Sequence, residues 1–169
     1  MNVAFNHLPP TARVWMYQAA RPLAEGELMA LLPRLAAFAE SWTSHGQQLR
    51  AAAEFLHRQF LVIGLDEGVA GASGCSIDAS VRFVQELEQE LGVALLEKSR
   101  MAFLVQGQVW LLSRSELRAA IAAGQLTADT LYFNNTLATK QELDAQWLVP
   151  AGQTWLATYF ANQIAGPAS

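Results

Sequence analysis

The order of strand-like and helix-like patterns constrains the fold of this chain more than any other feature. Residues 14–19 alternate β-branched and aromatic side chains, as strands do. Residues 25–42 repeat leucine and aromatic side chains at helical spacing. Residues 47–57 and then 59–66 follow as two strands, the second an apolar run typical of a buried strand. The first 66 residues therefore predict strand, helix, strand, strand.

Two points in this stretch leave alternatives open. Pro33 interrupts the first helical pattern, and because a proline inside a helix costs about 3 kcal/mol, we expect the helix to be kinked or split there. Residues 47–57 alternate like a strand, but three consecutive alanines favour helix by propensity. We take this segment as a strand, with His57 marking the turn that follows it.

A glycine-rich loop at residues 67–74 leads into a second amphipathic helix, for which Ser76 is a suitable N-cap and Gly92 a suitable C-terminal residue. Residues 101–105 and 109–112 then read as two strands around a tight turn. The order up to Val105 is strand, helix, strand, strand, helix, strand.

That order predicts an α+β protein whose core has the ferredoxin-like split βαβ arrangement. In this topology the loop after the first helix and the loop before the second helix lie at the same edge of the sheet. We therefore expect residues 42–46 and residues 73–78 to be neighbours in space. Open edges of such a sheet favour pairing, so we also expect a homodimer.

The last third of the chain predicts a smaller α/β extension packed on the core. Two capping boxes, Ser113 to Glu116 and Thr139 to Glu142, open short helices on either side of a strand at 131–133. We expect a core at residues 1–106 and an extension at residues 107–169. The extension is loosely similar to GYF-type peptide-binding modules, although it lacks their Gly-Tyr-Phe signature, so protein interaction is one alternative role.

Composition and charge exclude several classes of function. Lysine and arginine number 11 against 15 acidic residues, a net charge of −4, so nucleic acid is an unfavourable partner. Residues 1–10 lack the basic and apolar regions of a signal peptide, and no run approaches the roughly 20 apolar residues that span a bilayer. Cys75 is the single cysteine, which suits a reducing compartment. We expect a cytoplasmic protein that does not bind membranes.

The joint pattern of several segments resembles a family of small cytoplasmic proteins from Bacteroidetes-type bacteria that has no established activity. The resemblance rests on Trp15-x-Tyr17-Gln18-x-x-Arg21-Pro22-Leu23, on Trp42-x-x-His45-Gly46-x-x-Leu49, on Asp66-Glu67, on residues 71–81 (GASGCSIDASV) and on residues 133–135. Some members are described as ABC-transporter ATPases. Neither Lys98 nor Lys140 lies in the Gly-Lys-Ser/Thr sequence of a Walker A loop, so we do not extend that description to this chain.

The loop that opens the second helix is the candidate site. Ser73, Gly74 and Ser76 lie where free backbone N–H groups and the positive end of the helix dipole favour an anion. With Trp42 beside them, these residues predict binding of a small anion or metabolite.

The alternative is a cysteine-dependent enzyme. Cys75 would be the nucleophile or redox thiol, His45 its base and Asp78 the orienting carboxylate. The three histidines show no metal-ligand spacing, and the glycines at 68, 71 and 74 do not form a dinucleotide fingerprint. We therefore expect neither metal nor cofactor.

Overall fold

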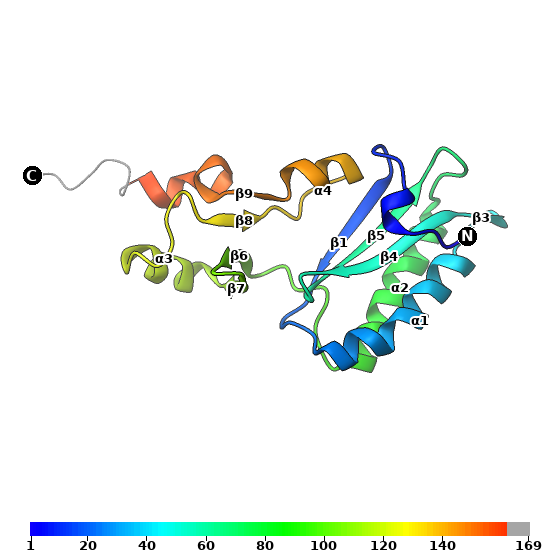
Figure 1. Ribbon diagram of the computed structural model, residues 1–169, viewed down its shortest axis with the longest axis horizontal. Coiled ribbons are helices and arrows are strands. Elements are labelled where there is room, and N and C mark those ends of the chain that lie inside the picture. The colour runs from blue at the N-terminus through cyan, green and yellow to red at the C-terminus, as the bar shows by residue number, and fades with distance from the viewer. Residues whose placement is uncertain (162–169) are drawn as a thin grey trace, which may run out of the picture. The chain divides into compact units, whose positions relative to one another are not determined.

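The computed structural model describes residues 1–161, and it confirms an α+β protein whose sheets are antiparallel (Figure 1). The chain forms two compact units. Among the described residues, the first comprises residues 1–97 and 135–145, and the second comprises residues 98–134 and 146–161. Within residues 1–161, no helix is long and apolar enough to cross a membrane.

The first unit contains a three-stranded sheet in the order β1-β5-β4 and a separate two-stranded hairpin, β2-β3. The predicted strands and helices are all present, and residues 47–57 are mainly strand, as expected. The elements are η1 (Phe5–His7), β1 (Arg13–Gln18), α1 (Glu25–Ser41), β2 (Thr43–Ser44), β3 (Gln47–Gln48), β4 (Arg50–Leu56), β5 (Phe60–Asp66), α2 (Gly74–Leu91) and α4 (Lys140–Gln146).

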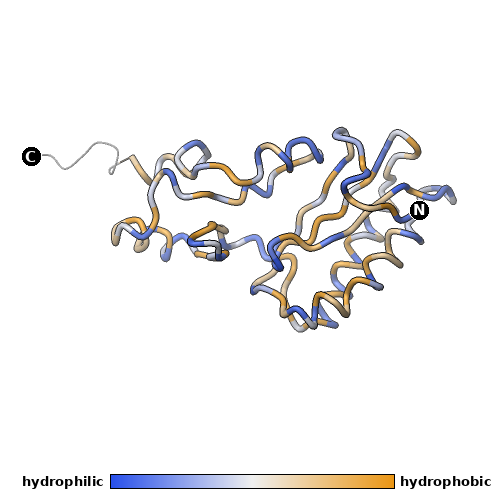
Figure 2. The backbone as a smooth tube through the Cα atoms, in the orientation of Figure 1, coloured by the Kyte–Doolittle hydropathy of each residue, from blue (hydrophilic) through white to orange (hydrophobic). Residues whose placement is uncertain are grey.

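The helices α1 and α2 lie side by side against one face of this sheet (Figure 1). Hydrophobic and hydrophilic residues alternate along both helices (Figure 2), as expected of helices that bury one face. Their buried residues, among them Leu35 and Leu87, form one core with the alternate strand residues Ala51, Ile63 and Leu65. The residues between these on β4 and β5, including Ala52 and Glu54, therefore face the opposite side of the sheet.

The ferredoxin-like arrangement is not shown, because the expected fourth strand belongs to another sheet. The strands β1, β4 and β5 do have the split βαβ order, but residues 101–105 pair with residues 108–112 and with residues 131–133. The turn between the paired segments is Gln106-Gly107, and both residues have positive φ, which suits a tight hairpin. A partner so close in sequence costs little loop-closure entropy.

A different segment takes the place beside β1. Arg13 forms an antiparallel bridge with Thr139, and the Val14 N–H donates to the Ala138 carbonyl at 3.0 Å. The Lys140 N–H donates to the Ala12 carbonyl at 2.8 Å. A stretch from the last third of the sequence thus completes the first unit.

The boundary expected at residue 106 falls inside the hairpin of residues 101–112, whereas the two compact units divide the chain after residue 97. The second unit has a sheet in the order β7-β6-β8-β9, with a core that includes Phe103, Leu117 and Phe160. Its elements are β6 (Met101–Val105), β7 (Gln108–Leu112), α3 (Arg114–Ala122), β8 (Leu131–Phe133), β9 (Leu148–Pro150), η2 (Ala151–Gln153) and η3 (Trp155–Phe160).

Helix ends and interruptions differ in two places from expectation. The helix α1 runs unbroken through Pro33, which lies on the exposed side of the helix, so water can hydrate the carbonyl left without a donor. The N-cap of α2 is Ser73 rather than Ser76. Gly92 ends α2 with a φ of +62°, as predicted for a C-terminal glycine.

Candidate functional site

The two loops predicted to be neighbours are in contact through Trp42. The indole Nε1 of Trp42 donates a buried hydrogen bond of 2.8 Å to the Ser76 carbonyl, which confirms the predicted proximity of residues 42–46 and 73–78. Trp42 is only 3% exposed and packs edge-on against Trp15, with ring centroids 5.8 Å apart. Its side chain is therefore mainly a structural anchor of the first core.

The polar groups of Ser73 and Ser76 satisfy one another. The Ser73 hydroxyl accepts from the Ser76 N–H at 3.2 Å, and the Ser73 N–H donates to the Ser76 hydroxyl at 2.7 Å. This reciprocal cap occupies the N–H groups of Ser73 and Ser76, which we expected to bind an anion. Gly74 is exposed beside them, on the first turn of α2.

The three predicted catalytic side chains are all exposed. Cys75 and Asp78 lie on the first turns of α2, and His45 lies in the turn between β2 and β3 with a φ of +51°. Within residues 1–161, the structure gives none of these side chains a hydrogen bond or ion pair. No group of three or more metal-ligating side chains occurs in the same range. A thiol and imidazole acting together stays a prediction.

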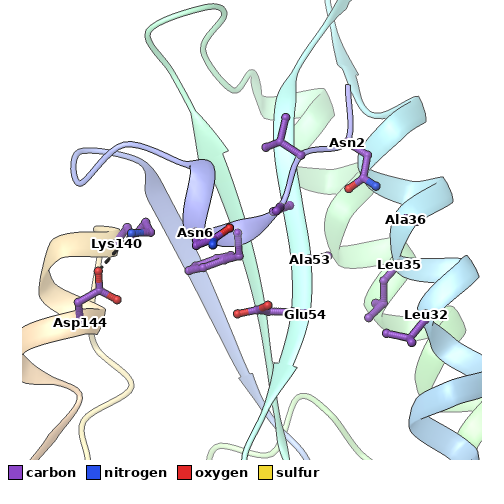
Figure 3. A pocket seen from close by; sticks show the side chains of 13 residues that line it. Asn2, Asn6, Leu32, Leu35, Ala36, Ala53, Glu54, Lys140 and Asp144 are labelled. Atoms are coloured by element: carbon purple, nitrogen blue, oxygen red, sulfur yellow. Dashed lines mark hydrogen bonds and ion pairs between the residues drawn. The ribbon is translucent and has the colours of Figure 1, made fainter.

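A second location in the first unit has the character of a binding pocket. A cavity of about 450 Å³ lies at the outer edge of β4, between residues 1–6 (the N-terminal segment), α1 and α4 (Figure 3). Its volume is within the roughly 300–1,000 Å³ of small-molecule sites. The residues that line it are Asn2, Val3, Ala4, Phe5, Asn6, Leu32, Leu35, Ala36, Ala52, Ala53, Glu54, Lys140 and Asp144.

The N-terminal segment forms one wall of this pocket because it is held against β4. The Ala51 N–H donates to the Met1 carbonyl at 3.0 Å, and the Val3 N–H donates to the Ala51 carbonyl at 2.9 Å. The chain then crosses the sheet face, where a Cβ on Gly64 would lie 2.9 Å from a ring carbon of Phe5. Glycine at position 64 thus allows Phe5 to pack directly on the sheet.

Glu54 is the polar side chain of the pocket that lacks a partner. It extends from β4 into the cavity (Figure 3), and within residues 1–161 no hydrogen bond or ion pair reaches its carboxylate. The side chain is half-buried, and this burial raises the pKa of Glu54 above its ordinary value. The cavity therefore contains one carboxylate without a compensating cation.

The other charges of the pocket compensate one another. Lys140 and Asp144, one turn apart on α4, form an ion pair of 3.2 Å, drawn as a dashed line in Figure 3. The opposite wall is apolar, and Leu32 and Leu35 project toward the cavity from α1. The cavity thus has an unpaired carboxylate on one side of β4 and a hydrocarbon surface on the other.

Sequence reasoning missed this pocket, although one signal was present. Glu54 follows three consecutive alanines and precedes Phe55 and Leu56, so it is the one charged residue within an apolar stretch of the strand. A lone carboxylate on a half-buried strand indicates either a surface position or a site, and the segment was the most ambiguous in the sequence. The N-terminal segment and α4, which close the pocket, carry no sequence signal for this contact.

A scan against models of known protein families, a search among curated proteins and a search among solved structures each find no match. The family resemblance described above therefore assigns no activity and no site residue to this chain.

Proposed function

We propose that this protein binds a small organic cation, such as a protonated amine, in the pocket at the edge of β4. The observation that carries the proposal is the half-buried Glu54 carboxylate, which faces the cavity with no partner among residues 1–161.

Electrostatics favours a cation over other ligands at this position. A carboxylate removed from water loses hydration, and an ammonium group that donates to it restores the lost interactions through a charge-assisted hydrogen bond. Lys140 does not supply this charge, because it is paired with Asp144. Leu32 and Leu35 line the same cavity across the edge of β4, and their apolar surface suits the hydrocarbon part of an amine that extends past this edge.

A titration with n-butylammonium tests the proposal, using calorimetry or amide chemical shifts. We expect Glu54→Gln to weaken binding by about tenfold or more, since hydrogen bonds to charged groups contribute about 1.5–3 kcal/mol. Glu25→Gln is the matched control, because Glu25 is exposed at the start of α1, away from the pocket lining. Neutral n-butanol should bind much more weakly. Equal binding of n-butanol, or unchanged binding to Glu54→Gln, would contradict the proposal.

Anion binding at residues 73–76 stays a prediction and takes second place. In its favour, Trp42 holds the neighbouring hairpin against the first turn of α2. Against it, the Ser73 hydroxyl and the Ser76 N–H are already bonded to each other. Inorganic phosphate should shift the amide resonances of Gly74 and Cys75 if the prediction holds, with chloride at the same ionic strength as control. The absence of a shift would overturn it.

A further inference from the structure

The outer edge of β4 is open beyond the point that the N-terminal segment covers. In an antiparallel pair, residues alternately direct both backbone groups toward the partner strand or away from it. The N–H and carbonyl of Ala51 bond outward to Val3 and Met1, so Ala51 is one of the outward residues. By the same alternation, Ala53 and Phe55 also direct their N–H and carbonyl groups away from β5.

These outward groups have no hydrogen-bond partner within residues 1–161. The N-terminal segment pairs with β4 only at Ala51 and then turns toward η1. Ala53 lines the pocket, so part of the open edge lies inside the cavity. Unpaired strand edges are templates for an additional strand, and peptide ligands use such edges in β-strand addition.

The two sides of this edge differ in chemistry. The side chains of Ala53 and Phe55 face the core formed with α1, and Leu32 and Leu35 line the cavity on that side. The side chain of Glu54 faces the opposite side of the sheet. An added strand would place alternate side chains against the leucines and against the carboxylate.

We infer that the ligand of this pocket is an extended peptide segment that adds to β4 as an antiparallel strand, with a lysine or arginine between two apolar residues. The basic side chain lies opposite Glu54, and the apolar side chains lie opposite Ala53 and Phe55. Cross-strand pairs of opposite charge and contacts with the leucines favour this alternation. The inference rests on the proposed function and specifies what carries its cation.

Charge disfavours a second copy of the chain as the occupant. An antiparallel pairing of two β4 strands centred on Glu54 would place the two Glu54 carboxylates opposite each other. Like charges opposite one another destabilise a sheet, whereas a basic residue at that position stabilises it. The open edge therefore selects a basic segment from a different chain.

The probe is the capped pentapeptide acetyl-Ser-Leu-Lys-Leu-Ser-amide, titrated into the full chain. We expect binding accompanied by slowed hydrogen exchange of the Ala53 and Phe55 amides. Methylation of both leucine nitrogens should weaken binding by about tenfold or more, because these N–H groups face β4. Methylation of the lysine nitrogen is the matched control, since that N–H faces solvent. Equal effects of the two methylations would overturn the inference.

A second experiment reverses the charge of residue 54 and of the peptide. The variant Glu54→Lys should prefer the peptide with glutamate in place of lysine, and unchanged preference for the lysine peptide would overturn the inference. If n-butylammonium binds through Glu54 but the peptide binds no better, the proposed function stands and the strand addition fails. If neither probe binds, both fail. Protection of the Ala53 and Phe55 amides by self-association in the absence of peptide would also overturn the inference.

Discussion

The Glu54 carboxylate lowers the stability of the fold when it is ionised, and it provides a group that can bind a cation. Its carboxylate is half-buried without a partner, and in such a position the charged form is disfavoured relative to water. Residues whose pKa is shifted by burial in a cavity are candidates for functional sites. The same physical reason determines how binding and stability at this residue depend on pH.

Because burial raises the pKa of Glu54, its carboxyl group is still protonated in the folded chain at a pH where it has ionised in the unfolded chain. Stability contributed by this residue therefore falls as pH rises through the two pKa values. We expect Glu54→Gln to raise the free energy of unfolding at pH 7, by less than about 1 kcal/mol because solvent screens the group, and to have little effect at pH 4. Urea denaturation of both proteins at the two pH values measures the difference.

The affinity for n-butylammonium has the opposite dependence, since only the ionised carboxylate attracts a cation. Binding should weaken as pH falls toward the usual range of a glutamate, while the amine stays protonated throughout. An affinity that is constant between pH 7 and pH 4 would argue against Glu54 as the acceptor.

Gly64 controls the N-terminal wall of the pocket. A Cβ at this position would lie 2.5 Å from Cδ1 of Leu8 and 2.9 Å from Cε2 of Phe5. We expect Gly64→Ala to displace the N-terminal segment, to lower the free energy of unfolding by about 1–3 kcal/mol and to weaken amine binding. Gly26→Ala is the control, since its Cβ would meet no atom within 4 Å, and it should not destabilise. Equal stability of the two variants in urea would contradict this explanation.

Pro33 removes one backbone hydrogen bond from the interior of α1. The fixed φ of proline is compatible with a helix, but its missing N–H leaves one helix carbonyl without a donor. Because Pro33 is exposed, water hydrates that carbonyl. We expect Pro33→Ala to raise the free energy of unfolding by about 1–3 kcal/mol, less the entropy that proline removes from the unfolded chain. Pro22→Ala, before the helix begins, should show no such gain. A stability unchanged by Pro33→Ala would contradict this prediction.

The strands and helices themselves were predicted well wherever local pattern decides. The alternation in β1, the apolar run of β5, the stripe of α2 and the capping box of α3 each depend on residues within one element. The Ser113 hydroxyl accepts from the Glu116 N–H, and the Glu116 carboxylate accepts from the Ser113 N–H, as the sequence predicts. The N-cap of α2 was predicted one turn too late, at Ser76 instead of Ser73, because two serines compete for the cap. The helix α1 is not split at Pro33, because the exposed side of the helix tolerates the proline.

The first unit depends on a segment far away in the sequence. Residues 138–140 pair with residues 12–14, and the Gln141 N–H donates to the Pro10 carbonyl at 2.9 Å. We expect that a protease site introduced between Glu97 and Lys98 and then cleaved will leave the two pieces associated. Gel filtration at micromolar concentration tests this, and separation of the pieces without denaturant would contradict it. The uncleaved variant is the control for elution volume.

Local patterns in the sequence predicted the strands and helices, because hydrophobic period, caps and glycines act over a few residues. The order of these elements then predicted that residues 42–46 lie near residues 73–78. Tertiary structure decided which sheet residues 101–105 join and which segment lies beside β1. Those choices depend on competition between distant partners, and no local pattern records it. The pocket, too, was decided by tertiary structure. Glu54 is visible in the sequence, but its lack of a partner follows from tertiary structure, because the one lysine that lines the pocket, Lys140, is paired with Asp144.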